Sequence, residues 1–151
     1  MKKSTKSLLS LFISIMLIMI IGLVTYADTS DQYFTFTINT SGGTFTKGGG
    51  ITPRIKSTDT KVYVYMTQAP YVYVQVKTWG KRQTARTYYN ETIGSVATVQ
   101  RGVQCSITNN IFENAGYKPT LSYITIRSAG SGGTASGCWS PDSSRNYVIV
   151  N

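Results

Sequence analysis

Apolar and polar residues alternate along most of this chain with a period of two. Phe34, Phe36 and Ile38 are separated by single threonines, and Val62 and Val64 are separated by a single tyrosine. Successive side chains of a β-strand point to opposite faces, whereas a helix needs apolar residues spaced three and four apart. Stretches rich in glycine and serine separate the alternating segments, as is typical of turns. The pattern predicts a fold made almost wholly of strands.

Eight segments carry the alternating pattern, and one helical turn is expected at residues 110–116, with Gly116 ending it. Closely spaced strands with glycine-rich turns are typical of β-sandwiches. We therefore predict an all-β chain, a single-domain antiparallel β-sandwich of about seven to nine short strands. The expected strands are residues 32–39, 61–67, 71–79, 95–100, 103–107, 121–127, 134–139 and 147–150.

The central segments 61–67 and 71–79 are separated by three residues and are expected to pair as an antiparallel hairpin. In that register the valines and Met66 form a core face, and tyrosines lie on the opposite face. Tyrosine combines a flat apolar body with a polar tip, so this face is a candidate platform for sugars or peptides. The alternative is an outer face that loops partly cover. The candidate aromatic surface consists of Tyr63, Tyr65, Tyr73 and Trp79.

The first 27 residues have the pattern of a secretory signal peptide. Three lysines precede an apolar run over residues 8–24, and Thr25-Tyr26-Ala27 places small residues at a cleavage site. The run also reaches the lower length limit of a membrane-spanning segment, so an uncleaved anchor is the alternative. We expect cleavage after Ala27 and a secreted, extracellular β-sandwich domain of residues 28–151.

Positive charge is the main compositional bias. The chain has 15 lysines and arginines against 6 acidic residues, and without residues 1–27 the balance is 12 against 6, a net charge of +6. Such a surface attracts anionic partners, or it keeps strand edges soluble and unpaired. We expect an anionic cell-wall polymer or lipid surface as partner, and no nucleic acid. The densest basic patch consists of Lys77, Lys81, Arg82 and Arg86. The alternative interpretation of these residues is a solvated hairpin tip.

Cys105 and Cys138 are the two cysteines of the chain. In an oxidising compartment a disulfide is the default, and it would stabilise the fold by about 4 kcal/mol. The alternative is a reactive thiol, which the lack of any histidine to activate it disfavours.

Enzymatic chemistry finds little support in this composition. Without histidine there is no Ser-His-Asp or Cys-His arrangement. Two of the six acids, Asp28 and Asp31, lie at the expected start of the domain. The other four lie beside turn residues, where a capping or solvent role is enough: Asp59, Glu91, Glu113 and Asp142. No Asp-x-Asp run suggests a calcium loop. The sequence therefore predicts a non-enzymatic protein without cofactor, metal site or catalytic residue.

The segment Ser136-Gly137-Cys138-Trp139-Ser140-Pro141-Asp142-Ser143, the opening strand and the N-terminal pattern resemble a family of small secreted proteins of unknown function from Gram-positive bacteria. Members are similar in size and end in a comparable Ser-Gly-aromatic-Trp segment, although Cys138 stands where an aromatic residue is expected. Because that family has no assigned activity, the resemblance implies secretion and a β fold, and it adds no site residue.

Two functions fit these observations. The first is a secreted, non-enzymatic cationic β-sandwich protein that binds anionic or glycan components of the cell envelope through the basic and aromatic hairpin. The alternative is a bacteriocin-like antimicrobial or toxin that acts on anionic membranes. A toxin should release dye from anionic liposomes, whereas a wall-binding protein should sediment with purified cell wall.

Overall fold

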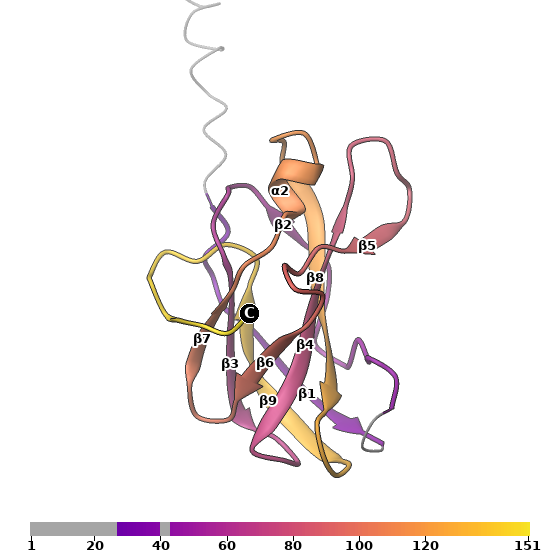
Figure 1. The fold of residues 1–151 in the computed structure, drawn as a ribbon, viewed down its shortest axis with the longest axis vertical. Helices are drawn as coiled ribbons and strands as arrows, with labels where there is room; N and C mark the ends of the chain where they lie inside the picture. The colour runs from indigo at the N-terminus through magenta and orange to yellow at the C-terminus, as the bar shows by residue number, and fades with distance from the viewer. Residues whose placement is uncertain (1–26, 40–42) are drawn as a thin grey trace, which may run out of the picture.

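The computed structural model describes residues 27–39 and 43–151, and within them the chain folds into two β-sheets packed face to face (Figure 1). The described part has ten strands and one short helix, α2 (Ile111–Asn114). The prediction of an all-β sandwich is confirmed, with ten strands where about seven to nine were expected. The strands are β1 (Gln32–Ile38), β2 (Arg54–Lys56), β3 (Val62–Gln68), β4 (Tyr73–Lys81), β5 (Tyr88–Asn90), β6 (Ala97–Gln100), β7 (Gln104–Ile107), β8 (Thr120–Ser128), β9 (Gly133–Ser140) and β10 (Val148–Ile149).

The strands divide between two sheets, and the chain crosses from one sheet to the other several times. Sheet A has the order β1-β9-β3-β7-β10, and sheet B has the order β2-β8-β4-β5, with β6 also paired to β4. The pairs are antiparallel except for β10, which runs parallel to β7. The predicted signal peptide and its anchor alternative lie outside the described residues, apart from Ala27. No helix within the described ranges is long and apolar enough to cross a membrane.

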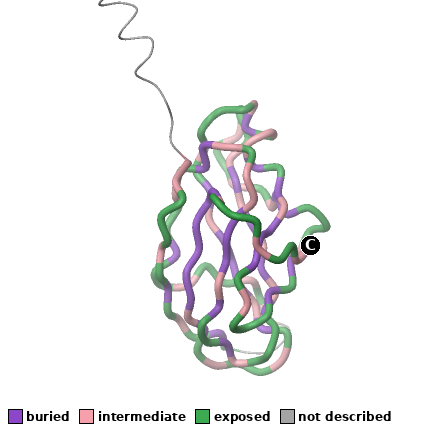
Figure 2. Tube along the Cα trace, turned by 90° about the vertical axis from the view of Figure 1, so that its left-hand side faces the viewer, coloured by how far each residue is buried: buried purple, intermediate pink, exposed green. Residues whose placement is uncertain are grey.

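The core lies between the two sheets and is built from the inward-pointing half of each alternating strand. Val64 of β3 and Val76 of β4 are fully buried in one cluster, together with Ile124 and Trp139. Figure 2 shows the buried residues running along the strands, with exposed residues gathered at the loops. Removing this apolar surface from water is the main driving force for such a fold.

The predicted hairpin between residues 61–67 and 71–79 is wrong. β3 lies in sheet A between β9 and β7, and β4 lies in sheet B between β8 and the pair β5 and β6. The connection between them therefore crosses from one sheet to the other. Alternation identified which residues of each strand point into the core, but the valine faces of β3 and β4 enter that core from opposite sheets.

Two glycines explain local features of the fold, at the end of α2 and in β9. α2 falls inside the helical turn predicted at 110–116, and Gly116 ends it with a φ of 72°, a value that glycine adopts without strain. In β9, a Cβ on Gly137 would lie 2.2 Å from the carbonyl oxygen of Tyr65, so glycine allows β9 to approach β3. β2 and β5 were not predicted, because three residues are too few to show an alternation.

The predicted disulfide between Cys105 and Cys138 is also wrong, since both cysteines are free and buried. Cys105 of β7 is opposite Val64, whereas Cys138 of β9 is opposite Tyr65. Val64 and Tyr65 are successive residues of β3, so the two cysteines point to opposite faces of sheet A. Their strands are two spacings apart, about 9.6 Å, which exceeds the Cα separation of roughly 7 Å that a disulfide can span.

Candidate functional site

The outward face of sheet B collects basic and aromatic side chains from neighbouring strands. Val74, Val76 and Thr78 of β4 are buried, so the residues between and after them point away from the core. Lys77 and Trp79 of β4 are opposite Thr125 and Tyr123 of β8. The register therefore brings residues far apart in the sequence onto one surface.

The segment before β2 adds two more side chains to this surface. The backbone N–H and carbonyl of Thr46 both bond to those of Ile126 in β8, with N···O distances of 2.9 Å. This bridge places Phe45 beside two cations. The Lys77 Nζ lies 4.3 Å from the centre of the Phe45 ring, and the Arg127 Cζ lies 4.6 Å from the same centre. Two positive groups therefore share one aromatic ring.

A second aromatic group continues the surface from Phe45. The rings of Trp79 and Tyr123 stack with centres 6.1 Å apart, and the Tyr88 ring meets the Tyr123 ring edge-on at 4.7 Å. Lys47 Nζ lies 5.1 Å from the Tyr123 ring centre, and Lys81 Nζ lies 5.2 Å from the Tyr88 ring centre. Burial raises the pKa of Tyr88 and of Tyr123, so both phenols are neutral at physiological pH.

We call this surface the cationic face. Its four cations take no part in the ion pairs of the described residues, which join Arg54 to Asp28, Lys56 to Asp142 and Arg82 to Glu91. Each cation instead contacts an aromatic ring, an interaction worth about 0.5–1 kcal/mol at exposed sites. The positive charge of the face is therefore left for a partner. The cationic face consists of Phe45, Lys47, Lys77, Trp79, Lys81, Tyr88, Tyr123 and Arg127.

The predicted basic patch is divided between this face and the loop after it. Lys77 and Lys81 lie on the cationic face with Trp79. Arg82 and Arg86 lie in the β4–β5 loop, where the Arg82 Nε donates to Glu91 Oε1 at 2.8 Å and Arg86 is exposed. The part of the face that lies outside β4 was not predicted from the sequence. Alternation along residues 121–127 places Tyr123 and Arg127 on one side, but it does not indicate that β8 pairs with β4.

The predicted aromatic surface is not one surface. Tyr63 and Tyr65 belong to sheet A, and Tyr73 and Trp79 belong to sheet B. Tyr63 is only 6% exposed, because the C-terminal segment covers it and places the Tyr147 ring centre 4.6 Å from its own. Of the four residues, Trp79 alone belongs to the cationic face.

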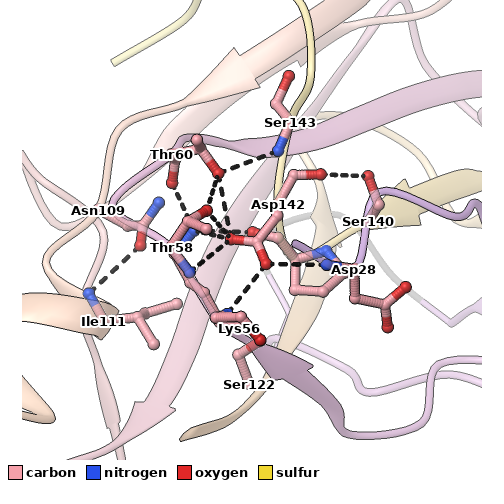
Figure 3. Close-up of polar contacts among 12 residues, drawn as sticks. Asp28, Lys56, Thr58, Thr60, Asn109, Ile111, Ser122, Ser140, Asp142 and Ser143 are labelled. Atoms are coloured by element: carbon pink, nitrogen blue, oxygen red, sulfur yellow. Dashed lines mark hydrogen bonds and ion pairs between the residues drawn. The ribbon is translucent and has the colours of Figure 1, made fainter. Parts of the chain in front are cut away.

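A buried polar cluster lies at the end of sheet A, where the chain leaves β9 (Figure 3). Asp142 is fully buried and Lys56 is 1% exposed, and the Lys56 Nζ lies 3.1 Å from Asp142 Oδ1. The same carboxylate accepts hydrogen bonds from the backbone N–H of Ser57 at 2.9 Å and the hydroxyl of Thr58 at 2.7 Å. It also accepts hydrogen bonds from the backbone N–H groups of Asp28 and Thr58 and from the Thr60 hydroxyl.

The hydrogen bonds of the cluster join β2 to the segment that follows β9. Lys56 Nζ also donates to the carbonyl oxygens of Thr60 and Pro141, so all three ammonium protons are used. Burial lowers the pKa of Lys56 despite the nearby carboxylate of Asp142. Burial opposes the ionisation of Asp142, but Lys56 and the donors of Ser57 and Thr58 outweigh it and lower the pKa of that carboxyl. The sequence had assigned Asp142 an ordinary capping or solvent role.

The part of the chain that the structure describes contains no group of three or more Cys, Asp or Glu side chains placed to hold a metal ion. Cys138 is 4% exposed, and burial, with the negative charge of Asp31, raises the pKa of its thiol to about 11. A protonated, buried thiol is a poor nucleophile. The cationic face is therefore the arrangement with the clearest potential to bind a partner.

Comparison with known proteins gives a family but no activity. No curated protein and no solved structure matches the chain. The sequence model of one family, described as "Protein of unknown function (DUF2712)", matches residues 22–143. The match includes strands β1 to β9 and the segment from Ser136 to Ser143, on which the resemblance to a family of unknown function was based. The chain belongs to the DUF2712 family of proteins of unknown function.

Proposed function

We propose that this chain is a secreted, non-enzymatic protein whose cationic face binds an anionic polymer of the cell envelope. The observation that carries the proposal is the position of Lys77 and Arg127 on one phenylalanine ring, with no carboxylate paired to either among the described residues. Two like charges held close together repel each other, and an anion between them removes that cost.

The arrangement of the rings favours an anionic ligand over a neutral sugar. Sugars stack on the free faces of aromatic side chains, but Lys47 lies over the Tyr123 ring and Lys81 lies over the Tyr88 ring. A neutral sugar would have to displace these cations, whereas an anion is attracted to them. The ring contacts then hold the cations in place.

The shape of the face suits a polymer better than a single small ion. Lys77 and Lys81 lie on the same side of β4, four residues apart, which corresponds to roughly 13 Å along a strand. Arg127 extends the charge onto β8, and Lys47 extends it onto the segment before β2. A chain with repeated negative groups contacts several of these cations at once, and the separate weak contacts add up.

The cell envelope is proposed as the location for two reasons that come from the sequence. The N-terminal pattern is that of a signal peptide, and the resemblance described above is to secreted proteins of Gram-positive bacteria. Anionic polymers with phosphate groups are abundant at such surfaces. The net charge of +6 on residues 28–151 raises the local concentration of these polymers around the protein.

The test compares two variants that each remove two positive charges. In the first, Lys77→Gln and Arg127→Gln change the cationic face, and in the control, Lys61→Gln and Arg145→Gln change another part of the molecule. Binding to purified wall teichoic acid is measured for both, with uncharged dextran as the neutral probe. We expect the first variant to bind about fivefold more weakly and the control to bind like the wild type. Equal losses in both variants, or equal binding of dextran, would contradict the proposal.

One observation favours a second function, attack on anionic membranes. Tyr71, Val72 and Tyr73 are consecutive and exposed at 48%, 44% and 41%, where the β3–β4 connection enters β4. Exposed tyrosines next to an aliphatic residue suit the interface of a lipid bilayer. Dye release from vesicles of phosphatidylglycerol that is lost in the variant Tyr71→Ser with Val72→Ser would support membrane attack. Intact vesicles at concentrations that saturate teichoic acid would favour the envelope-binding function.

A further inference from the structure

A pocket of about 360 Å³ lies next to the cationic face, between the β4–β5 loop and the segment that joins α2 to β8. Both elements lie at the same end of the sandwich in Figure 1. Lys81, Arg82 and Lys118 line the pocket together with Gln83 and Thr120, and no carboxylate belongs to its lining. Lys81 therefore contributes to both the pocket and the cationic face.

A buried acid, Glu91, holds the side chain of Arg82, which lines this pocket. Its Nε donates to Glu91 Oε1 at 2.8 Å, and its guanidinium lies 4.4 Å from the centre of the Tyr89 ring. Glu91 is 5% exposed, and its other oxygen accepts a hydrogen bond from Asn114 Nδ2 at 2.6 Å. Asn114 of α2 therefore positions Glu91, and Glu91 positions Arg82.

The outer edge of this guanidinium remains available. The two terminal nitrogens of Arg82 make no hydrogen bond within residues 27–39 and 43–151, whereas Nε is used by Glu91. A guanidinium edge with two parallel donors matches two oxygens of a phosphate group. Since the ion pair with Glu91 and the Tyr89 ring already fix the side chain, little conformational entropy is lost when a ligand binds.

The charge around the pocket also indicates the charge of the ligand. Three cations line it, and Glu91 neutralises one of them, which leaves a local charge of +2. A phosphate monoester carries close to two negative charges at neutral pH, because its second pKa is near 6. A phosphodiester carries one. The volume leaves room for the small alcohol or sugar to which the phosphate is attached.

From this geometry we infer that the pocket binds a phosphate monoester group, with Arg82 as a two-donor contact and Lys81 and Lys118 as flanking cations. The inference rests on the proposed function in one respect: the group belongs to the end, or to a side branch, of the anionic polymer that lies along the cationic face. The pocket itself binds the same group on a small molecule.

The first experiment measures the binding of glycerol 1-phosphate by calorimetry. The wild type is compared with Arg82→Lys, which keeps the charge but loses the two parallel donors, and with Lys118→Gln. The control is Arg86→Gln, which removes a charge from the same loop but does not line the pocket. We expect a loss of about tenfold for Arg82→Lys, a smaller loss for Lys118→Gln and no change for Arg86→Gln. Equal weakening by Arg82→Lys and Arg86→Gln, or no binding by the wild type, would overturn the inference.

A second variant tests whether Glu91 orients Arg82 or only changes the charge near the pocket. Glu91→Gln removes a negative charge, so a purely electrostatic pocket should bind glycerol 1-phosphate more tightly. If Glu91 orients Arg82, the variant should bind more weakly, and its unfolding curve shows whether it remains folded. Tighter binding in folded Glu91→Gln would contradict the role of Glu91 as a positioning residue and the two-donor contact that depends on it.

The last comparison distinguishes this inference from the proposed function. The Lys77→Gln and Arg127→Gln variant should bind glycerol 1-phosphate like the wild type, because neither residue lines the pocket. Phosphatase treatment of teichoic acid removes monoesters and leaves the diester backbone, so it should weaken binding by the wild type but not by Arg82→Lys. Loss of polymer binding in the first variant with intact binding of the small ester would support both proposals. Binding of glycerol 1-phosphate that depends on Arg82, without any polymer binding, would support the pocket alone.

Discussion

Two lysines, Lys56 in the buried cluster and Lys77 on the cationic face, show two uses of the same side chain. Lys56 has carboxylate and carbonyl acceptors for all three of its protons and is 1% exposed. Lys77 has an aromatic ring beside it and is in no ion pair among the described residues. The charge of Lys56 is paired inside the fold, whereas the charge of Lys77 is available to a partner. The local sequence, a basic residue in a strand, is alike at both positions.

The difference comes from what packs around each side chain. Burial of an ammonium or a carboxylate costs several kcal/mol unless a partner and further hydrogen bonds offset it, so Lys56 and Asp142 depend on each other. Lys77 is only half-buried and keeps part of its water, and its cation–π contact adds about 0.5–1 kcal/mol. A change in the cluster should therefore affect folding, and a change on the face should affect binding.

The largest effect is expected from Asp142→Asn. It leaves Lys56 buried beside a neutral group and should lower the free energy of unfolding by about 3–5 kcal/mol, as measured by urea denaturation. The control Asp31→Asn changes an exposed acid and should stay within about 0.5 kcal/mol of the wild type. Replacing both partners, Lys56→Met with Asp142→Leu, should cost less than Asp142→Asn alone. Similar losses for Asp142→Asn and Asp31→Asn would show that the buried pair does not hold the fold together.

Acid should lower the stability of the folded protein through the buried cluster of Lys56 and Asp142. The folded state holds the pKa of Asp142 below its usual value, so at low pH the unfolded chain binds a proton more readily than the folded one. This contribution to stability is complete above the usual Asp pKa of about 3.9 and is lost as the pH falls through the lower folded value. Urea midpoints measured from pH 6 downward should decline below about pH 4. The decline should be shallower in Asp142→Asn, and identical slopes would contradict the assignment.

Salt should weaken ligand binding by the cationic face and leave the stability that the buried cluster contributes almost unchanged. Exposed charges are screened over about 8–10 Å at physiological ionic strength, whereas buried pairs are screened much less. Binding of teichoic acid should weaken several-fold between 50 and 200 mM salt. The Lys77→Gln and Arg127→Gln variant should show a smaller salt dependence than the wild type, and all variants should keep their urea midpoints. Salt-independent binding in the wild type would contradict an electrostatic face.

The smallest effect is expected from reductant. Cys105 and Cys138 point to opposite faces of sheet A, so there is no internal disulfide to break and the unfolding temperature should not change. Alkylation of the unfolded protein without reductant should modify both thiols, while the folded protein should react slowly because both are buried. Reductant-sensitive stability would indicate a cross-link that this structure does not allow.

Much of the fold was predictable because alternation is a local property. The eight predicted segments correspond to strands of the structure, and the helical turn and its terminating Gly116 were placed correctly. The site was predicted only where it lies on one strand, as with Lys77, Trp79 and Lys81. Its other half, including Phe45 and Arg127, comes from segments that meet β4 only through sheet pairing and loop packing.

The sequence by itself determined which residues point into the core, because a period of two assigns each side chain to one face of its strand. It also determined the excess of positive charge, which depends on composition alone. Only the tertiary structure decided which strands are neighbours. Strand pairing places β3 and β4 in different sheets and the two cysteines on opposite faces of sheet A. Tertiary packing also buries Lys56 with Asp142 and brings Lys77 and Arg127 to the ring of Phe45. The physical reason is that pairing depends on how whole apolar faces fit together across the core, and residues distant in the sequence contribute to that fit.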